Sequence, residues 1–177
     1  LLTHSLRLDA TPPAAWGARL SVMGRFTEPL LALHGGNWRA WKGQAYANLA
    51  QVDLQALRPY LPWEVDVRQG AGALRAWVDV EAATVRGATL DVALRNVQLR
   101  WNPDLDTLAL PWVAGRLGLA QHGATQEIST RGLEFETADG VHWPGGNVRL
   151  ALTQAKDTQP AQGSFSADRL DLAALAQ

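Results

Sequence analysis

Two glutamates are the residues of this sequence whose type and spacing come closest to an active site. Glu134 and Glu136 stand two positions apart, so in a strand both side chains would point to the same side. Two carboxylates held together in this way could act as the acid and the base of a glycosidase. A basic neighbour, Arg131, favours a solvated strand face with cross-strand ion pairs instead. We therefore keep a hydrolase only as the last of four hypotheses.

Other residues that could do chemistry do not form a recognisable site. The four histidines are not spaced as metal ligands. Gly70-Ala71-Gly72 lacks the third glycine and the helix of a dinucleotide-binding loop. The turn at residues 102–106 lacks the glycine and the distal glutamate of a calcium loop. The chain has no cysteine, which excludes disulfides and thiolate chemistry. The sequence thus predicts no enzyme activity, no metal and no cofactor.

The eight tryptophans are the remaining candidates for a binding role. They could stack on sugars, stack on the bases of single-stranded nucleic acid, or pack at strand ends. The formal net charge of -1, from 16 basic and 17 acidic side chains, disfavours nucleic acid as a partner. Because the tryptophans are scattered along the chain, packing is favoured over a carbohydrate platform. A carbohydrate-binding β-sandwich stays as an alternative.

The elements that would position these residues are predicted by alternation of apolar and polar side chains. Leu74, Ala76, Val78 and Val80 alternate with mostly polar residues, which is typical of a strand with one apolar side. Similar patterns predict strands over residues 2–8, 19–27, 41–51, 64–69, 72–85, 88–101, 107–110, 114–121, 126–130, 133–137, 148–154 and 163–170.

Three local features complete this prediction. Arg86-Gly87 is expected to turn a hairpin between residues 72–85 and 88–101, and a bulge near Arg95-Asn96 would keep the apolar side continuous. Asp53 is a favourable N-cap for a short helix. The fold class is therefore mostly β with one or two short helices. Alternation alone leaves open whether the apolar side forms an open groove or the closed core of a structural β-domain.

Composition indicates a single folded unit. The 177 residues are 47% apolar and 19% charged, which is typical of a globular chain with a real core. No apolar run reaches the ~20 residues of a membrane span. A strand followed by Asp-Leu-x-Ala-Leu occurs at residues 43–57 and again at 163–175. We expect one β-rich segment, residues 1–177, of a longer repeat-built protein, with repeat units ending near residues 62 and 177.

Several stretches resemble a known family. Residues 41–62, the hairpin at 70–101, the run Arg131-Gly132-Leu133-Glu134-Phe135 with its continuation to residue 146, and the closing residues 163–175 are similar to the YhdP branch of the AsmA-like bacterial envelope proteins. The resemblance implies long antiparallel strands in a curled, groove-shaped sheet. It also implies an inner-membrane-anchored, largely periplasmic protein that helps to move phospholipids between the inner and outer membranes.

This resemblance implies a section of a hydrophobic conduit. Its expected partners are phospholipid acyl chains and adjacent segments of the same longer chain, with membrane contact only through regions outside these residues. The candidate groove-lining residues share one strand parity and are apolar: Leu20, Val22, Phe26, Leu49, Leu74, Val78, Val80, Leu90, Val92, Leu94, Val148, Leu150 and Leu152.

Overall fold

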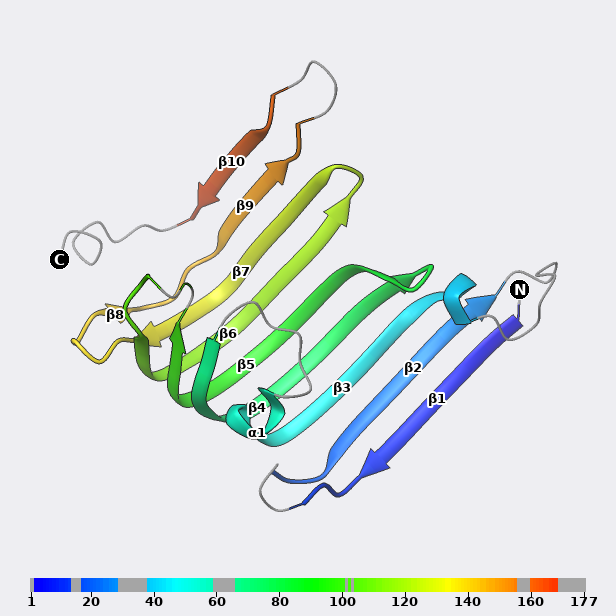
Figure 1. The fold of residues 1–177 in the computed structure, drawn as a ribbon, viewed down its shortest axis with the longest axis horizontal. Helices are drawn as coiled ribbons and strands as arrows, with labels where there is room; N and C mark the ends of the chain where they lie inside the picture. The colour runs from blue at the N-terminus through cyan, green and yellow to red at the C-terminus, as the bar shows by residue number, and fades with distance from the viewer. Residues whose placement is uncertain are drawn as a thin grey trace.

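Ten antiparallel strands form one open sheet in the computed structural model, which describes residues 2–13, 17–28, 38–58, 66–100, 102, 104–155 and 160–168 (Figure 1). The strands lie in chain order from β1 to β7, followed by β9 and β10, and β8 pairs with β7 beside β9. The bounds are β1 Leu2–Ala10, β2 Leu20–Glu28, β3 Lys42–Asp53, β4 Asp66–Glu81, β5 Thr84–Arg100, β6 Leu108–His122, β7 Thr125–Glu136, β8 His142–Trp143, β9 Val148–Thr153 and β10 Gln162–Ala167.

This meander confirms the predicted fold class. The helices of the described residues are short: α1 spans Leu54–Leu57 and the 3-10 helix η2 spans Trp38–Ala40. Every described strand belongs to the one sheet, so no second sheet packs against it within these residues. The alternative of a β-sandwich is therefore wrong for the described part of the chain, because a sandwich requires two packed sheets.

The cross-strand register sorts the side chains onto two faces, since directly opposed residues point to the same side. We call one side the apolar face; one of its rows consists of Leu8, Val22, Ala47, Ala76, Leu90, Leu117, Thr130, Val148 and Ala167. We call the other side the polar face; its neighbouring row consists of Arg7, Met23, Tyr46, Trp77, Thr89, Gly118, Ser129, Arg149 and Ser166.

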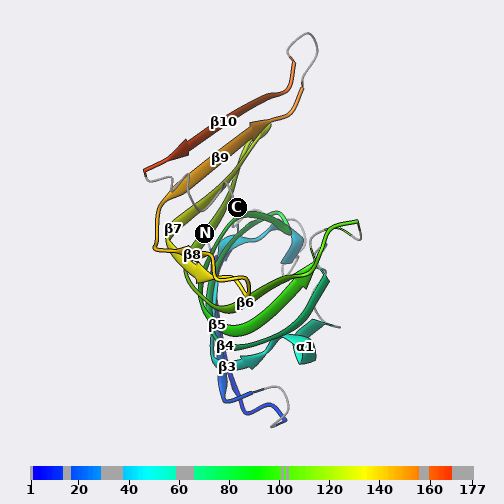
Figure 2. The same ribbon diagram turned by 90° about the vertical axis from the view of Figure 1, so that its left-hand side faces the viewer.

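The strands curl at one end, as Figure 2 shows for β3 to β6. The register shifts near this end of the sheet. In the β3–β4 pairing the shift lies between Leu49 and Val52, and in the β4–β5 pairing it lies where β5 contains Asn96. Each bulge adds a residue to one strand and bends it. Asn96 has a φ of 53°, and Leu94 and Val97 on its two sides are both buried in the same cluster. The bulge predicted near Arg95-Asn96 is thus confirmed.

The hydrophobic core lies inside this curl. It consists of eight buried residues: Val52, Leu54, Val67, Leu74, Val92, Leu94, Val97 and Leu110. Helix α1 closes it, because Leu54 is only 4% exposed. Asp53 caps α1 as predicted, accepting hydrogen bonds from the backbone N–H of Gln55 at 2.9 Å and of Ala56 at 3.4 Å. Gly70 has no side chain, and this lets helix α1 pack close to β4, because a Cβ at this position would lie 2.8 Å from Leu54 Cδ1.

The turn of the β4–β5 hairpin differs from the prediction. It is formed by Ala82 and Ala83, both at positive φ (52° and 57°), which suits the two-residue turn favoured by twisted strands. Arg86-Gly87 lies inside β5 instead. The absent side chain of Gly87 makes room for Asp79 across a bulge, because a Cβ there would lie 3.3 Å from Asp79 Oδ2. The glycine therefore marks an irregular ladder and not a chain reversal.

Several strands predicted separately are continuous. Residues 66–81 form one strand through Gly70 and Gly72, β6 runs through Pro111, and β7 runs through Gly132. Glycine and proline in these strands mark bends and bulges and not strand ends. The two-residue strand β8 was not among the predicted strands. Residues 59–65, residue 101 and residues 169–177, including the second Asp-Leu-x-Ala-Leu, lie outside the described residues, so the repeat organisation stays a prediction.

Candidate functional site

The apolar face keeps a continuous row of apolar side chains outside the hydrophobic core. Beyond the curled end, one row crosses nine strands from edge to edge with no polar side chain: Leu6, Gly24, Ala45, Val78, Ala88, Leu119, Ile128, Leu150 and Phe165. Its side chains remain open to solvent at both edges, with Leu6 58% and Phe165 59% exposed. A continuous apolar strip of this kind marks a binding surface.

All thirteen candidate lining residues lie on this apolar face, as the register shows. Leu74, Val92 and Leu94 are at most 9% exposed and belong to the closed core. Leu49 and Leu90 pack against that core. The other eight form the open part of the face. Seven of them are half-buried, and Leu152 is more exposed, at 43%. The core residues therefore close one end of the face, and the remainder offer contact area.

Small side chains make up the middle of the open face. Ala45 and Ala47 of β3 are opposed by Val78 and Ala76 of β4. The ring of Phe26 lies over two glycines, because a Cβ on Gly24 or Gly43 would come within 2.8 Å of it. Residues with little or no side chain let an apolar ligand approach the backbone closely. Leucine and phenylalanine side chains near both edges extend further from the sheet.

A cluster around His4 and Trp41 bounds the apolar face at the end opposite to the curl. The two rings stack with centroids 4.3 Å apart and an interplanar angle of 6°. His4 Nε2 lies 3.3 Å from Oε2 of Glu28, whose residue is only 1% exposed. The sequence analysis missed this cluster. The alternation of residues 2–8 placed His4 on the apolar parity, but only the register reveals that it faces Phe26.

The tryptophans with described side chains do not form a platform. Trp77 packs against Tyr46, with centroids 5.2 Å apart, and Trp143 stacks on Phe135. Trp77 and Trp143 come from different strands, and each contacts an aromatic neighbour within the sheet. This arrangement agrees with the predicted packing role and offers no shared stacking surface for a sugar.

Glu136 and the turn residue Asn102 have structural partners, whereas Glu134 forms no hydrogen bond or ion pair with another described residue. Glu136 accepts a hydrogen bond from Trp112 Nε1 at 3.0 Å. Asn102 accepts one from the backbone N–H of Asp104 at 3.1 Å, as in an ordinary turn. Among the described residues there is no group of three or more acidic or histidine side chains that could hold a metal ion. None of the helices in this part of the chain is long and apolar enough to cross a membrane.

Comparison with known proteins gives one match. A family model described as "YhdP protein" matches residues 1–177, the full length of the chain. The searches of curated proteins and of solved structures found no match. The sequence therefore matches this family from its first residue to its last.

Proposed function

Since the chain belongs to the YhdP family of AsmA-like envelope proteins, we propose that it forms a section of a periplasmic hydrophobic conduit for phospholipids. In this proposal the apolar face holds acyl chains and helps them pass between the inner and outer membranes. The observation that supports it is the open apolar strip, which runs from β1 to β10 while the core stays confined to the curled end. The function requires no catalytic residue.

The strength of the attraction suits transport. Burial of an acyl chain contributes ~0.8 kcal/mol per CH₂ group, so partial cover of a two-chain lipid yields on the order of 10 kcal/mol. This attraction is non-directional, so a chain held by leucine, valine and alanine can slide along them. The row from Leu6 to Phe165 contains no polar side chain that would hold the lipid at one point.

The dimensions of the strip suit it as well. Nine strands spaced ~4.8 Å apart extend the strip over roughly 40 Å, more than the ~30 Å hydrocarbon core of a bilayer. The outer edges of β1 and β10 have no strand partner within the described residues. Adjacent segments of a longer chain could pair there and lengthen the conduit, because a free strand edge presents unpaired N–H and C=O groups.

Neighbouring residues of β2 provide a matched test of this proposal. Val22 lies on the apolar face and Met23 on the polar face. We expect Val22→Asp to reduce the uptake of a fluorescent phospholipid by the delipidated chain about tenfold, because the carboxylate must be desolvated beneath the acyl chain. Met23→Asp should load like the parent chain. Val78→Asp should behave like Val22→Asp.

Circular dichroism of each variant verifies that it is folded. Equal loading of the Val22 and Met23 variants, or no uptake by the parent chain, would refute the proposal. Quenching of tryptophan fluorescence by sugars in the absence of lipid uptake would favour a carbohydrate-binding module instead.

A further inference from the structure

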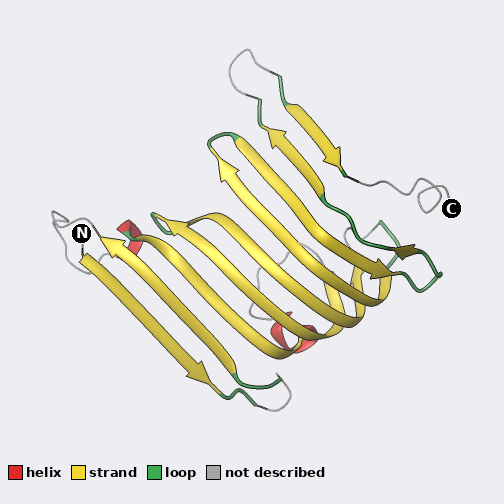
Figure 3. Cartoon of the chain, turned by 180° about the vertical axis from the view of Figure 1, so that it is seen from behind, coloured by secondary structure: helices red, strands yellow, loops and turns green. Residues whose placement is uncertain are grey.

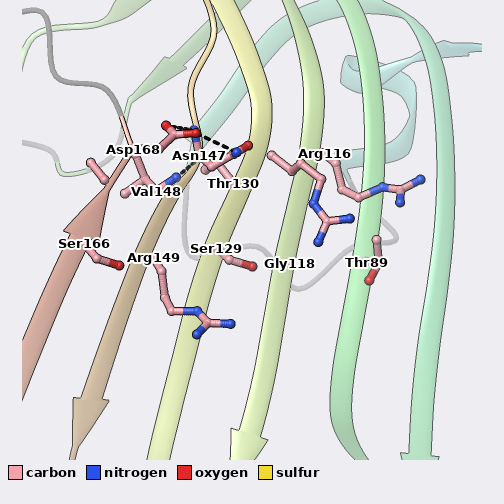
Figure 4. Close-up of a pocket in the computed structure, with 12 residues that line it drawn as sticks. Thr89, Arg116, Gly118, Ser129, Thr130, Asn147, Val148, Arg149, Ser166 and Asp168 are labelled. Carbon is pink, nitrogen blue, oxygen red and sulfur yellow. Dashed lines mark hydrogen bonds between the residues drawn. The ribbon is translucent and has the colours of Figure 1, made fainter.

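The polar face contains an open depression of about 610 Å³ over β5, β6, β7, β9 and β10 (Figure 4). It lies on the other side of the sheet from the apolar strip, so its role does not depend on the proposed lipid conduit. Its floor follows one cross-strand row, which consists of Thr89, Gly118, Ser129, Arg149 and Ser166. Three hydroxyl groups and a guanidinium group are thereby brought to one surface.

Three arginines supply hydrogen-bond donors to this depression: Arg116, Arg131 and Arg149. Arg116 donates through Nη2 to Asp91 at 3.0 Å and also through Nε. Arg149 pairs through Nε with Glu127 at 3.0 Å. Arg131 is exposed and has no partner in the described part of the chain. Each guanidinium carries five N–H donors, so most of these donors remain available to a ligand.

The other polar groups of the depression also favour an anion. The hydroxyls of Thr89, Ser129 and Ser166 make no hydrogen bond among the described residues, and each can donate one. Asp168 is the one carboxylate that lines the depression. Both of its oxygens accept hydrogen bonds from Asn147, at 2.7 Å from the backbone N and at 2.7 Å from Nδ2. The free groups of the site are therefore predominantly donors.

We propose that this depression binds a phosphate group, carried either by free phosphate and soluble phosphate esters or by an anionic lipid headgroup. Arginine forks bind phosphate oxygens in pairs through charge-assisted hydrogen bonds, and serine hydroxyls complete such sites. Arg131, which has no partner to give up among the residues that the structure describes, provides the principal charge. Arg116 and Arg149 are held in place by their carboxylate partners and offer their remaining donors.

The first experiment uses inorganic phosphate as the probe. The ¹⁵N-labelled chain is titrated at constant ionic strength, and saturable amide shifts are expected at Gly118, Ser129 and Ser166. Arg131→Gln should raise the Kd about tenfold, as expected for the loss of a charge-assisted contact. Arg25→Gln removes one exposed charge from the same face outside the depression and should leave the Kd unchanged. Shifts that do not saturate, or equal losses in both variants, would overturn the proposal.

A second arm distinguishes the sources of the phosphate. Vesicles of phosphatidylcholine, with and without phosphatidylglycerol, are sedimented with the parent chain and with the Arg131→Gln variant. Binding that requires both phosphatidylglycerol and Arg131 identifies a lipid headgroup. Saturable phosphate binding without such vesicle binding identifies free phosphate or a soluble ester. The proposed site would be contradicted if the Arg131→Gln variant bound vesicles as well as the parent chain did and phosphate caused no saturable amide shift.

Discussion

Arg116 shows how individual residues order the polar face. Its guanidinium lies 5.5 Å from the centre of the Trp77 ring and donates to both carboxylate oxygens of Asp91. The hydrogen bond from Arg116 lowers the pKa of Asp91 below its ordinary value of 3.8, and the positive charges of Arg116 and Arg75 add to the effect. A charge pair joined in this way fixes the β5–β6 register on the polar side.

The stability that this pair contributes depends on pH. Because folding lowers the pKa of Asp91, its contribution to stability is present above pH ~4 and is lost as the pH falls through the lowered value. Asp91→Asn should reduce the free energy of unfolding by ~1 kcal/mol near neutral pH, a partly exposed pair being screened by solvent. Urea unfolding should show this difference shrinking below the ordinary pKa of 3.8. Asp139→Asn, in an exposed turn, serves as the control, and a difference independent of pH would refute the assignment.

At the scale of elements, bulges and a single helical turn divide the apolar face into a filled end and an open part. The bulges bring residues three positions apart, such as Leu94 and Val97, to the same side. Helix α1 then covers them with Leu54. Between these bulges and the irregular pairing at Gly87 the strands keep their regular alternation, and apolar side chains such as Leu119 remain exposed there. One sequence pattern thus produces both a core and an exposed surface.

A pair of leucine truncations tests this division. Leu54→Ala should lower the free energy of unfolding by ~2–4 kcal/mol, because it removes buried methyl groups and leaves a cavity. Leu119→Ala, on the open part of the face and 39% exposed, should cost less than ~1 kcal/mol. Midpoints of urea unfolding give both values. Equal losses at the two positions would mean that the open part of the face is packed as firmly as the core.

The sequence alone predicts the parts of this architecture that depend on local pattern. Parity placed Val22, Val78 and Leu150 on one face, and Asp53 identified the start of α1. Register is not local, because it is set by pairing between strands and by bulges. For this reason the sequence could not separate Val92, which is buried, from Val78, which is open, nor assemble the phosphate-binding row. The hairpin turn was predicted at Gly87 and not at Ala82-Ala83, because glycine occurs at bulges as readily as in turns.

On the scale of the whole molecule, the two faces of one sheet differ in chemistry. Figure 3, seen from behind, shows the uninterrupted meander that separates them. The apolar strip and the arginine-lined depression are back to back across the same strands, β5, β6, β7, β9 and β10. A single layer of backbone therefore carries a surface suited to acyl chains on one side and a surface suited to phosphate on the other. The central claim is that the apolar side stays open.

Site-specific photo-crosslinking in the presence of phospholipid tests that claim most directly. A benzophenone amino acid is placed at Val78 or Val22 on the apolar face, and at their chain neighbours Trp77 or Met23 on the polar face, both outside the arginine-lined depression. We predict acyl-chain adducts, identified by mass spectrometry, at Val78 and Val22 and none at Trp77 and Met23. Adducts of equal yield on both faces, or none at Val78 and Val22 in the folded chain, would contradict the account.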